Sequence, residues 1–135
     1  MNGLCCKLSG WTHWLIRFSL AGTFLFHGRS KFMHDAQMMS VSMGVPEWMV
    51  YLVGSLEMIA GLLIVVGGCC RLSWATRLSG LIISVIMVGA IIKAHWGVWN
   101  VMHGGMEFNV LILAVSIHFL FHGNSCNSSS NSCSK

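Results

Sequence analysis

The chain has 135 residues, of which 55% are hydrophobic and only 9% are charged. Soluble domains carry about 25% charged residues, so this composition excludes a soluble surface and predicts a lipid bilayer as the surrounding solvent. At this length we expect one domain. We assign the formal net charge of +4 to membrane topology, and expect no nucleic-acid partner.

Four apolar segments approach the roughly 20 residues that a membrane-spanning helix needs. They are Trp11–Gly28, Trp48–Gly67, Trp74–Ala94 and Glu107–Phe121. Because each is a continuous apolar run, the segments predict helices and not the alternating strands of a barrel. The sequence therefore predicts an all-α, up-and-down, four-helix integral membrane bundle over residues 1–123, followed by a flexible tail over residues 124–135.

This threading places both termini on one side of the membrane, called side A here. The loops Arg29–Glu47 and His95–Met106 then lie on the opposite side, called side B. Apart from Arg17, side A has four basic residues and side B has three: Lys7, Arg71, Arg77 and Lys135 against Arg29, Lys31 and Lys93. The positive-inside rule therefore predicts cytoplasmic termini.

The first apolar segment contains Arg17, about 9 Å below the side-A interface at 1.5 Å per residue. An arginine at helix centre costs roughly 2.5–3.5 kcal/mol on insertion scales, so it normally faces the bundle and has a partner. The alternative is that its side chain snorkels to the nearby interface.

The loop Arg29–Glu47 is long enough to suggest a functional segment that lies at the interface. Its proline, Pro46, fits a turn directly before the second helix. Thioether and imidazole groups suit Cu(I), although methionine also fills irregular apolar gaps. The weak metal candidates are Met33, His34, Met38, Met39 and Met43.

The second segment carries Glu57 near the mid-plane of the membrane. A carboxylate at this depth is a functional-site hypothesis by default. It could pair with Arg17 as a structural clamp, or remain protonated and donate a hydrogen bond. Gly54, Gly61 and Gly67 on the same segment predict close helix contacts.

The third segment follows a tight turn, so it must neighbour the second. It contains the small-residue pair Gly80 and Ser84, and we expect its role to be structural. The fourth segment opens with Glu107, which suits the dipole of a helix N-terminus.

Threading the helices predicts two tiers of polar residues. The side-B tier contains His27, Arg29, Lys31, Glu57, Lys93, His95, His103, Glu107 and Asn109. Such a tier could hold a small polar or quinone-like headgroup, or it could be a polar network that only fixes packing. On side A, His13 and His118 lie at similar depth and offer haem ligation as an alternative to interfacial histidines.

All six cysteines fall on side A, and no pair has the CxxC spacing of a thioredoxin-type centre. Cytoplasmic cysteines would be reduced thiols, whereas an external side A would favour disulfides.

A series of short motifs in fixed order resembles the DoxX family of small four-helix membrane proteins. From about Arg17 to Leu113, the matching pieces are Arg17, Phe24-Leu25-Phe26-His27-Gly28-Arg29-Ser30-Lys31-Phe32, Gly44-Val45-Pro46, Glu57, Gly61, Gly67, Arg71 and Glu107-Phe108-Asn109. The C-terminus departs from the family pattern. The resemblance implies a bacterial inner-membrane protein. Some relatives look like the quinone-reacting subunit of thiosulfate oxidation, others accompany oxidative-stress, thiol or metal-handling systems, and distant ones act as membrane chaperones.

The leading hypothesis is a redox-associated membrane subunit that binds a quinone or a small sulfur or thiol species and works with other membrane subunits. Glu57 and His27 would handle protons. The expected binding residues are Arg17, Lys31, His95, Glu107 and Asn109. The alternatives are a non-catalytic accessory or assembly subunit of a larger membrane complex, and a copper-handling membrane protein. No cofactor is specified by a motif; quinone is the candidate, and haem and copper are the alternatives.

Overall fold

The computed structural model describes residues 2–33, 36–94, 96–100 and 105–124, apart from the side chains of residues 2–10 and 94. Within these residues the chain is all-helical and has no strands. The helices are α1 (Asn2–Met33), α2 (Ala36–Met43), α3 (Glu47–Cys69), α4 (Ser73–Ala94) and α5 (Glu107–His122). The boundaries of α3, α4 and α5 confirm the predicted segments to within two residues.

The prediction of four helices was wrong, because the described residues form five. The additional helix, α2, lies in the first side-B loop, where alanine, glutamine and methionine favour helix formation. It ends before Gly44, whose φ of 61° requires a left-handed conformation. Pro46 then stands at the N-cap of α3 with extended backbone, as the sequence predicted.

Helix α1 is longer than the apolar run that predicted it, at 32 residues. Apolar length marks only the part of a helix that faces lipid or core, whereas the backbone hydrogen bonds continue wherever no proline interrupts them. The extension at its C-terminal end carries Lys31 one helical turn past Gly28.

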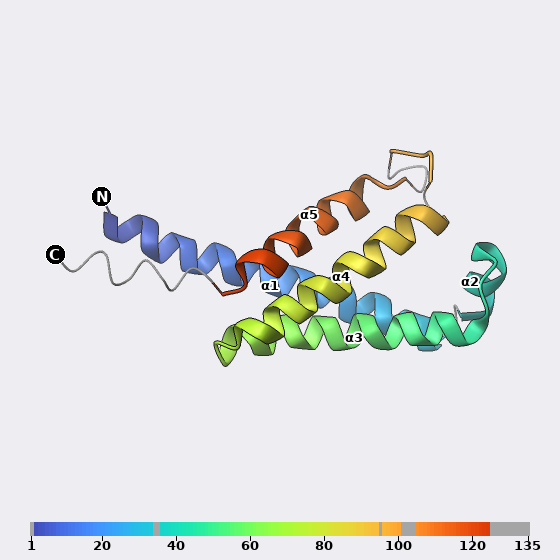
Figure 1. Ribbon diagram of the computed structural model, residues 1–135, viewed down its shortest axis with the longest axis horizontal. Coiled ribbons are helices and arrows are strands. Elements are labelled where there is room, and N and C mark those ends of the chain that lie inside the picture. Colours follow the sequence, from blue (N-terminus) through green and yellow to red (C-terminus); the bar gives the residue numbers. More distant parts are fainter. Residues whose placement is uncertain (1, 34–35, 95, 101–104, 125–135) are drawn as a thin grey trace.

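The helices pack in the order α1 against α3, α3 against α4, and α4 against α5. Within the described residues the backbones of α1 and α5 are not closely packed, and these two helices touch through side chains such as His13 and Phe119. Figure 1 shows α4 and α5 diverging from α1 and α3 toward the end where α2 lies. Helix α1 begins and α5 ends at the opposite end. The helices therefore lie closest together toward the end where α1 begins and diverge toward the end where α2 lies.

Two glycines permit close helix contacts. A Cβ on Gly28 of α1 would lie 2.8 Å from the carbonyl oxygen of Gly54 on α3. A Cβ on Gly80 of α4 would lie 2.7 Å from the carbonyl oxygen of Ser116 on α5. Ser84 and Ser116 also share a hydrogen bond of 2.8 Å between their hydroxyls. The small residues on α3 and α4 thus make the contacts that the sequence predicted.

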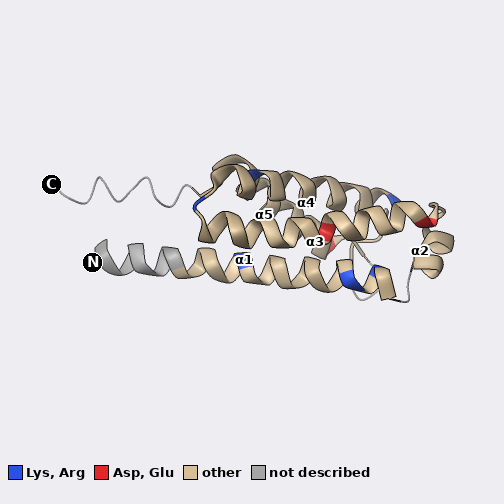
Figure 2. Cartoon of the chain, turned by 90° about the horizontal axis from the view of Figure 1, so that it is seen from below, with Lys and Arg blue, Asp and Glu red and all other residues tan. Residues whose placement is uncertain are grey.

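The core is apolar and is drawn from all four long helices. Its buried residues are Leu20, Ala21, Phe24, Ala60, Ile64, Ile83, Met87, Ile112 and Phe119. Many large apolar side chains are exposed outside this core, and most of the described helical length is free of charged residues (Figure 2). The spans Glu47–Cys69 and Ser73–Lys93 are long and apolar enough to cross a membrane, and α5 is apolar but shorter.

The α4–α5 contact predicts that two alanine substitutions on α4 differ in their effect on thermal stability. Gly80→Ala places a methyl group against the backbone of Ser116 and Leu120, and overpacking of this kind costs about 1–3 kcal/mol. Gly89→Ala is the matched control, because a Cβ there meets nothing within 4 Å. Thermal unfolding in detergent should show a lower Tm for Gly80→Ala alone; equal Tm values would contradict the contact.

Candidate functional site

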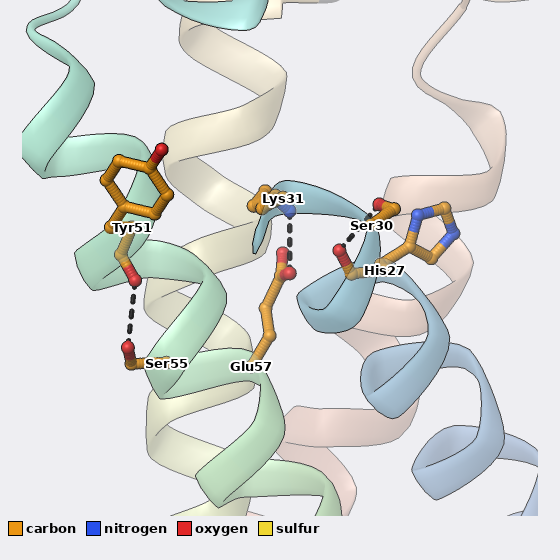
Figure 3. Close-up of polar contacts among 6 residues, drawn as sticks. All are labelled: His27, Ser30, Lys31, Tyr51, Ser55 and Glu57. Carbon is orange, nitrogen blue, oxygen red and sulfur yellow. Dashed lines mark hydrogen bonds and ion pairs between the residues drawn. The ribbon is translucent and has the colours of Figure 1, made fainter. Parts of the chain in front are cut away.

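A buried ion pair joins α1 to α3 in the open half of the bundle. The ammonium Nζ of Lys31 lies 2.6 Å from Oε2 of Glu57, and the two side chains are 13% and 6% exposed. Figure 3 shows the two side chains pointing toward one another from their helices. Removing either charge from water costs several kcal/mol, and the attraction between the two groups offsets part of that cost.

The spacing of residues along both helices explains why these charges meet. Gly28 and Lys31 are three residues apart on α1, and Gly54 and Glu57 are three residues apart on α3. Residues at this spacing share a helix face. Contact between the two glycines therefore aligns the faces that carry the charges. In agreement, a Cβ on Gly54 would lie 3.2 Å from the Cβ of Lys31.

The ion pair borders a cavity of about 300 Å³ to which every helix contributes. The lining residues are Thr23, Phe24, His27, Lys31, Met39, Met43, Glu57, Met87, Ala90, Gly105, Phe108, Asn109 and Ile112. This volume lies at the lower end of the range for small-molecule sites, which are mostly apolar with a few convergent polar groups. This cavity is likewise lined mostly by apolar residues, with a few polar groups among them.

The polar groups of the cavity supply complementary chemistry. Lys31 has three N–H donors and directs one at Glu57. The Asn109 amide both donates and accepts hydrogen bonds. His27 lines the cavity, but Figure 3 shows its ring directed away from Glu57. The arrangement can therefore bind a small polar group through donors and acceptors, with an imidazole at its border.

The structure brings together four of the site residues expected from the sequence: His27, Lys31, Glu57 and Asn109. Glu107 lies in the first turn of α5 and is not among the residues that line the cavity. His95 and His103 lie outside the described residues.

Arg17 belongs to a second polar cluster near the other end of the bundle. It is 3% exposed, so the prediction that it faces the bundle is correct and it does not snorkel. Its Nη1 donates to the carbonyl oxygen of Ile64 at 2.6 Å and to the hydroxyl of Thr76 at 3.2 Å. Its guanidinium also lies 5.0 Å from the centroid of the Phe119 ring.

The suggested clamp between Arg17 and Glu57 is not what the structure has, because Glu57 pairs with Lys31. Arg17 instead meets α3 at Ile64, seven residues beyond Glu57 and about 10 Å further along the helix axis. The two polar clusters are therefore separate sites.

Asn124 completes the Arg17 cluster, which the sequence did not indicate. Its Oδ1 accepts from Nη2 of Arg17 at 2.5 Å and from the hydroxyl of Thr76 at 2.9 Å. Its amide nitrogen donates to the carbonyl oxygen of Gly67 at 2.7 Å. From the sequence we assigned Asn124 to the start of the tail. Thr76 could have been identified from the sequence, because its hydroxyl lies within an apolar run.

The side-A histidines lie close together beside this cluster. The ring centroids of His13 and His118 are 6.4 Å apart, and those of His118 and His122 are 4.5 Å apart in a stacked pair. Phe119 packs edge-on against both His13 and His118. Ligation of a haem by His13 and His118 stays an untested alternative.

The candidate copper residues do not share one location. Met39 and Met43 line the cavity, whereas Met33 and Met38 are 61% and 75% exposed; His34 lies outside the described residues. In the part of the chain that the structure describes, no three His, Cys, Asp or Glu residues gather as a metal site. Cys69 and Cys70 are exposed at the turn after α3.

Comparison with known proteins finds one family and one relative to which the chain is similar. The sequence model of the DoxX family matches residues 13–96. A protein of Bacillus subtilis (strain 168), named "Putative oxidoreductase CatD", is 32% identical over 111 residues, which cover 81% of this chain and 77% of the relative. No solved structure matches the chain.

The buried pair predicts a non-additive effect of substitutions. Lys31→Met leaves the Glu57 carboxylate buried without its partner, which costs about 3–5 kcal/mol. Lys31→Met combined with Glu57→Gln removes both charges and should recover most of this loss. Lys93→Met, at an exposed lysine, is the control and should change stability by about 0.5 kcal/mol or less. Equal losses in the single and double variants, measured by chemical denaturation in detergent, would contradict a charged pair.

The Asn124 hydrogen bonds predict that the end of α5 depends on this amide. Asn124→Ala leaves groups around Arg17 unsatisfied and should destabilise the protein by about 1–3 kcal/mol. Ser42→Ala removes an exposed hydroxyl that bonds only to a nearby carbonyl in its own helix, so it serves as a control of small effect. A Tm for Asn124→Ala equal to that of the control would show that the amide is dispensable.

Proposed function

Because the chain belongs to the DoxX family, we propose that it is a membrane subunit associated with redox chemistry that binds a quinone headgroup beside Lys31 and Glu57. The observation that carries this proposal is the buried ion pair opening onto a mostly apolar cavity of about 300 Å³. The name of the Bacillus subtilis relative, which includes the word oxidoreductase, supports a redox role.

In this proposal α1, α3, α4 and α5 cross the bacterial inner membrane as a four-helix bundle, with both termini in the cytoplasm. The exposed apolar side chains on these helices support burial in lipid. Helix α2 then lies at the membrane surface, where Met39 and Met43 cover the cavity that they line. Met39 and Met43 of α2 thus form an apolar wall of the site.

The residues of the cavity have distinct roles in this proposal. Lys31 keeps two N–H donors beyond the one directed at Glu57, and these hydrogen-bond a quinone carbonyl and stabilise negative charge that develops on it. Asn109 donates to the second carbonyl. Reduction of a quinone to a quinol adds two electrons and two protons. A partner protein supplies the electrons, and Glu57 and His27 pass the protons to the quinone in the cavity.

Quinone binding to protein in lipid nanodiscs tests the proposal. Wild-type protein should bind a short-chain benzoquinone, and Lys31→Met and Asn109→Leu should each weaken binding. Loss of the hydrogen bond from the charged Lys31 costs about 1.5–3 kcal/mol, which is roughly a tenfold to hundredfold rise in Kd. Loss of the neutral Asn109 hydrogen bond costs about 0.5–1.5 kcal/mol, which is roughly a twofold to tenfold rise. Lys93→Gln, at an exposed lysine, should leave Kd unchanged. Wild-type protein that binds no quinone, or variants that bind it normally, would overturn the assignment.

The second candidate function is a non-catalytic accessory subunit of a larger membrane complex. The apolar side chains exposed over the helices could dock other spanning segments as well as lipid. Co-purification with a larger complex whose activity survives Glu57→Gln would favour this role. Loss of that activity in Glu57→Gln, with the complex intact, would favour the quinone site.

A further inference from the structure

A second hollow, an apolar groove of about 350 Å³, lies between α1 and α5. These two helices touch through the side chains of His13, Arg17 and Phe119, and Figure 1 shows α5 leaving α1 toward the end where α2 lies. The floor of the groove includes Leu20 and Ile112, which are 6% and 5% exposed. Leu15 and Leu111, each 63% exposed, form its borders. The groove therefore opens to the surroundings of the bundle along its length.

The groove adjoins the cavity beside the ion pair. Thr23, Phe108 and Ile112 line both hollows. The hydroxyl of Thr23 donates to the carbonyl oxygen of Ser19 at 2.9 Å, so it presents no unsatisfied donor to the groove. The two hollows are therefore neighbours, one lined mostly by apolar residues of α1 and α5 and the other bordered by the Lys31–Glu57 pair.

Building on the proposed function, we propose that this groove binds the isoprenoid tail of the quinone whose headgroup occupies the cavity, and that the ligand enters sideways from the lipid through the α1–α5 opening. A compact polar head on a long apolar chain matches the polarity of the two neighbouring hollows. An apolar groove that adjoined only apolar packing would need no such ligand, whereas this one adjoins a cavity bordered by two buried charges.

In this assignment the separation between α1 and α5 is the entrance through which the ligand reaches the cavity. Helix pairs α1–α3 and α4–α5 are each joined by glycine contacts, so the α1–α5 side can remain open without loss of those contacts. A quinone dissolved in the bilayer then reaches Lys31 without its tail leaving apolar surroundings.

The test compares two quinones that share a headgroup, one without a tail and one with several isoprene units, in the same nanodiscs. Ser19→Trp fills the groove from α1, and Leu111→Trp fills it from α5 at an exposed position. Each should raise the Kd of the tailed quinone by at least about tenfold, since burial of several methylene groups is lost, and leave the Kd of the tailless quinone unchanged. Val85→Trp, 65% exposed on α4 and outside the groove, controls for an added tryptophan and for partitioning into lipid.

The outcomes separate this inference from the proposed function. Unchanged binding of both quinones by both tryptophan variants overturns the groove and leaves the headgroup site standing. An equal loss of both quinones in both variants also overturns it, because the groove then does not act on the tail. Failure of wild-type protein to bind either quinone overturns the proposed function, and this inference with it.

Discussion

The contact between the glycine faces of α1 and α3 is the constraint on which the rest of the structure depends. It brings the backbones so close that a Cβ on Gly28 would overlap the backbone of Gly54. Because α1 and α3 run in opposite directions, Lys31 and Glu57 lie one turn from these glycines toward opposite ends, and their long side chains span that offset to meet at 2.6 Å. A carboxylate so deep in an apolar helix would otherwise face a large desolvation cost.

The two polar clusters have opposite characters. Around Arg17 the hydrogen bonds reach Ile64 on α3, Thr76 on α4 and Asn124 after α5, so the cluster ties α1 to the other three long helices. A Cβ on Gly68 would lie 3.1 Å from the Arg17 side chain, which shows how closely it is packed. Lys31 and Glu57 instead border open volume. We interpret the first cluster as structural and propose the second as the binding site, because Lys31 and Glu57 line a cavity that leaves room for another molecule.

The sequence predicted the three helices α3, α4 and α5 well, because unbroken apolar runs between turn residues leave little choice of structure. It missed α2, since eight residues of moderate polarity carry too weak a periodic pattern to distinguish a helix from a loop. It predicted Glu57 as a site residue from its depth, and Lys31 from its place in the side-B tier and from the family resemblance; their role in a site stays a prediction, although the structure brings the two together. It could not choose the partner of Glu57, because pairing depends on which helix faces meet, and that follows from the Gly28–Gly54 contact. Asn124 was missed for a related reason: an asparagine beside a Ser/Asn-rich tail looks like part of the tail until its long-range hydrogen bonds are seen.

The central claim is that the cavity beside Lys31 and Glu57 receives a ligand headgroup. An experimental structure of the protein in lipid nanodiscs, determined with a short-chain benzoquinone present, tests this most directly. We expect density for the ring in the cavity, within hydrogen-bonding distance of Nζ of Lys31 and of the Asn109 amide. A cavity closed by Met39 and Met43 over a dry Lys31–Glu57 pair, with the quinone bound elsewhere or absent, would contradict the account.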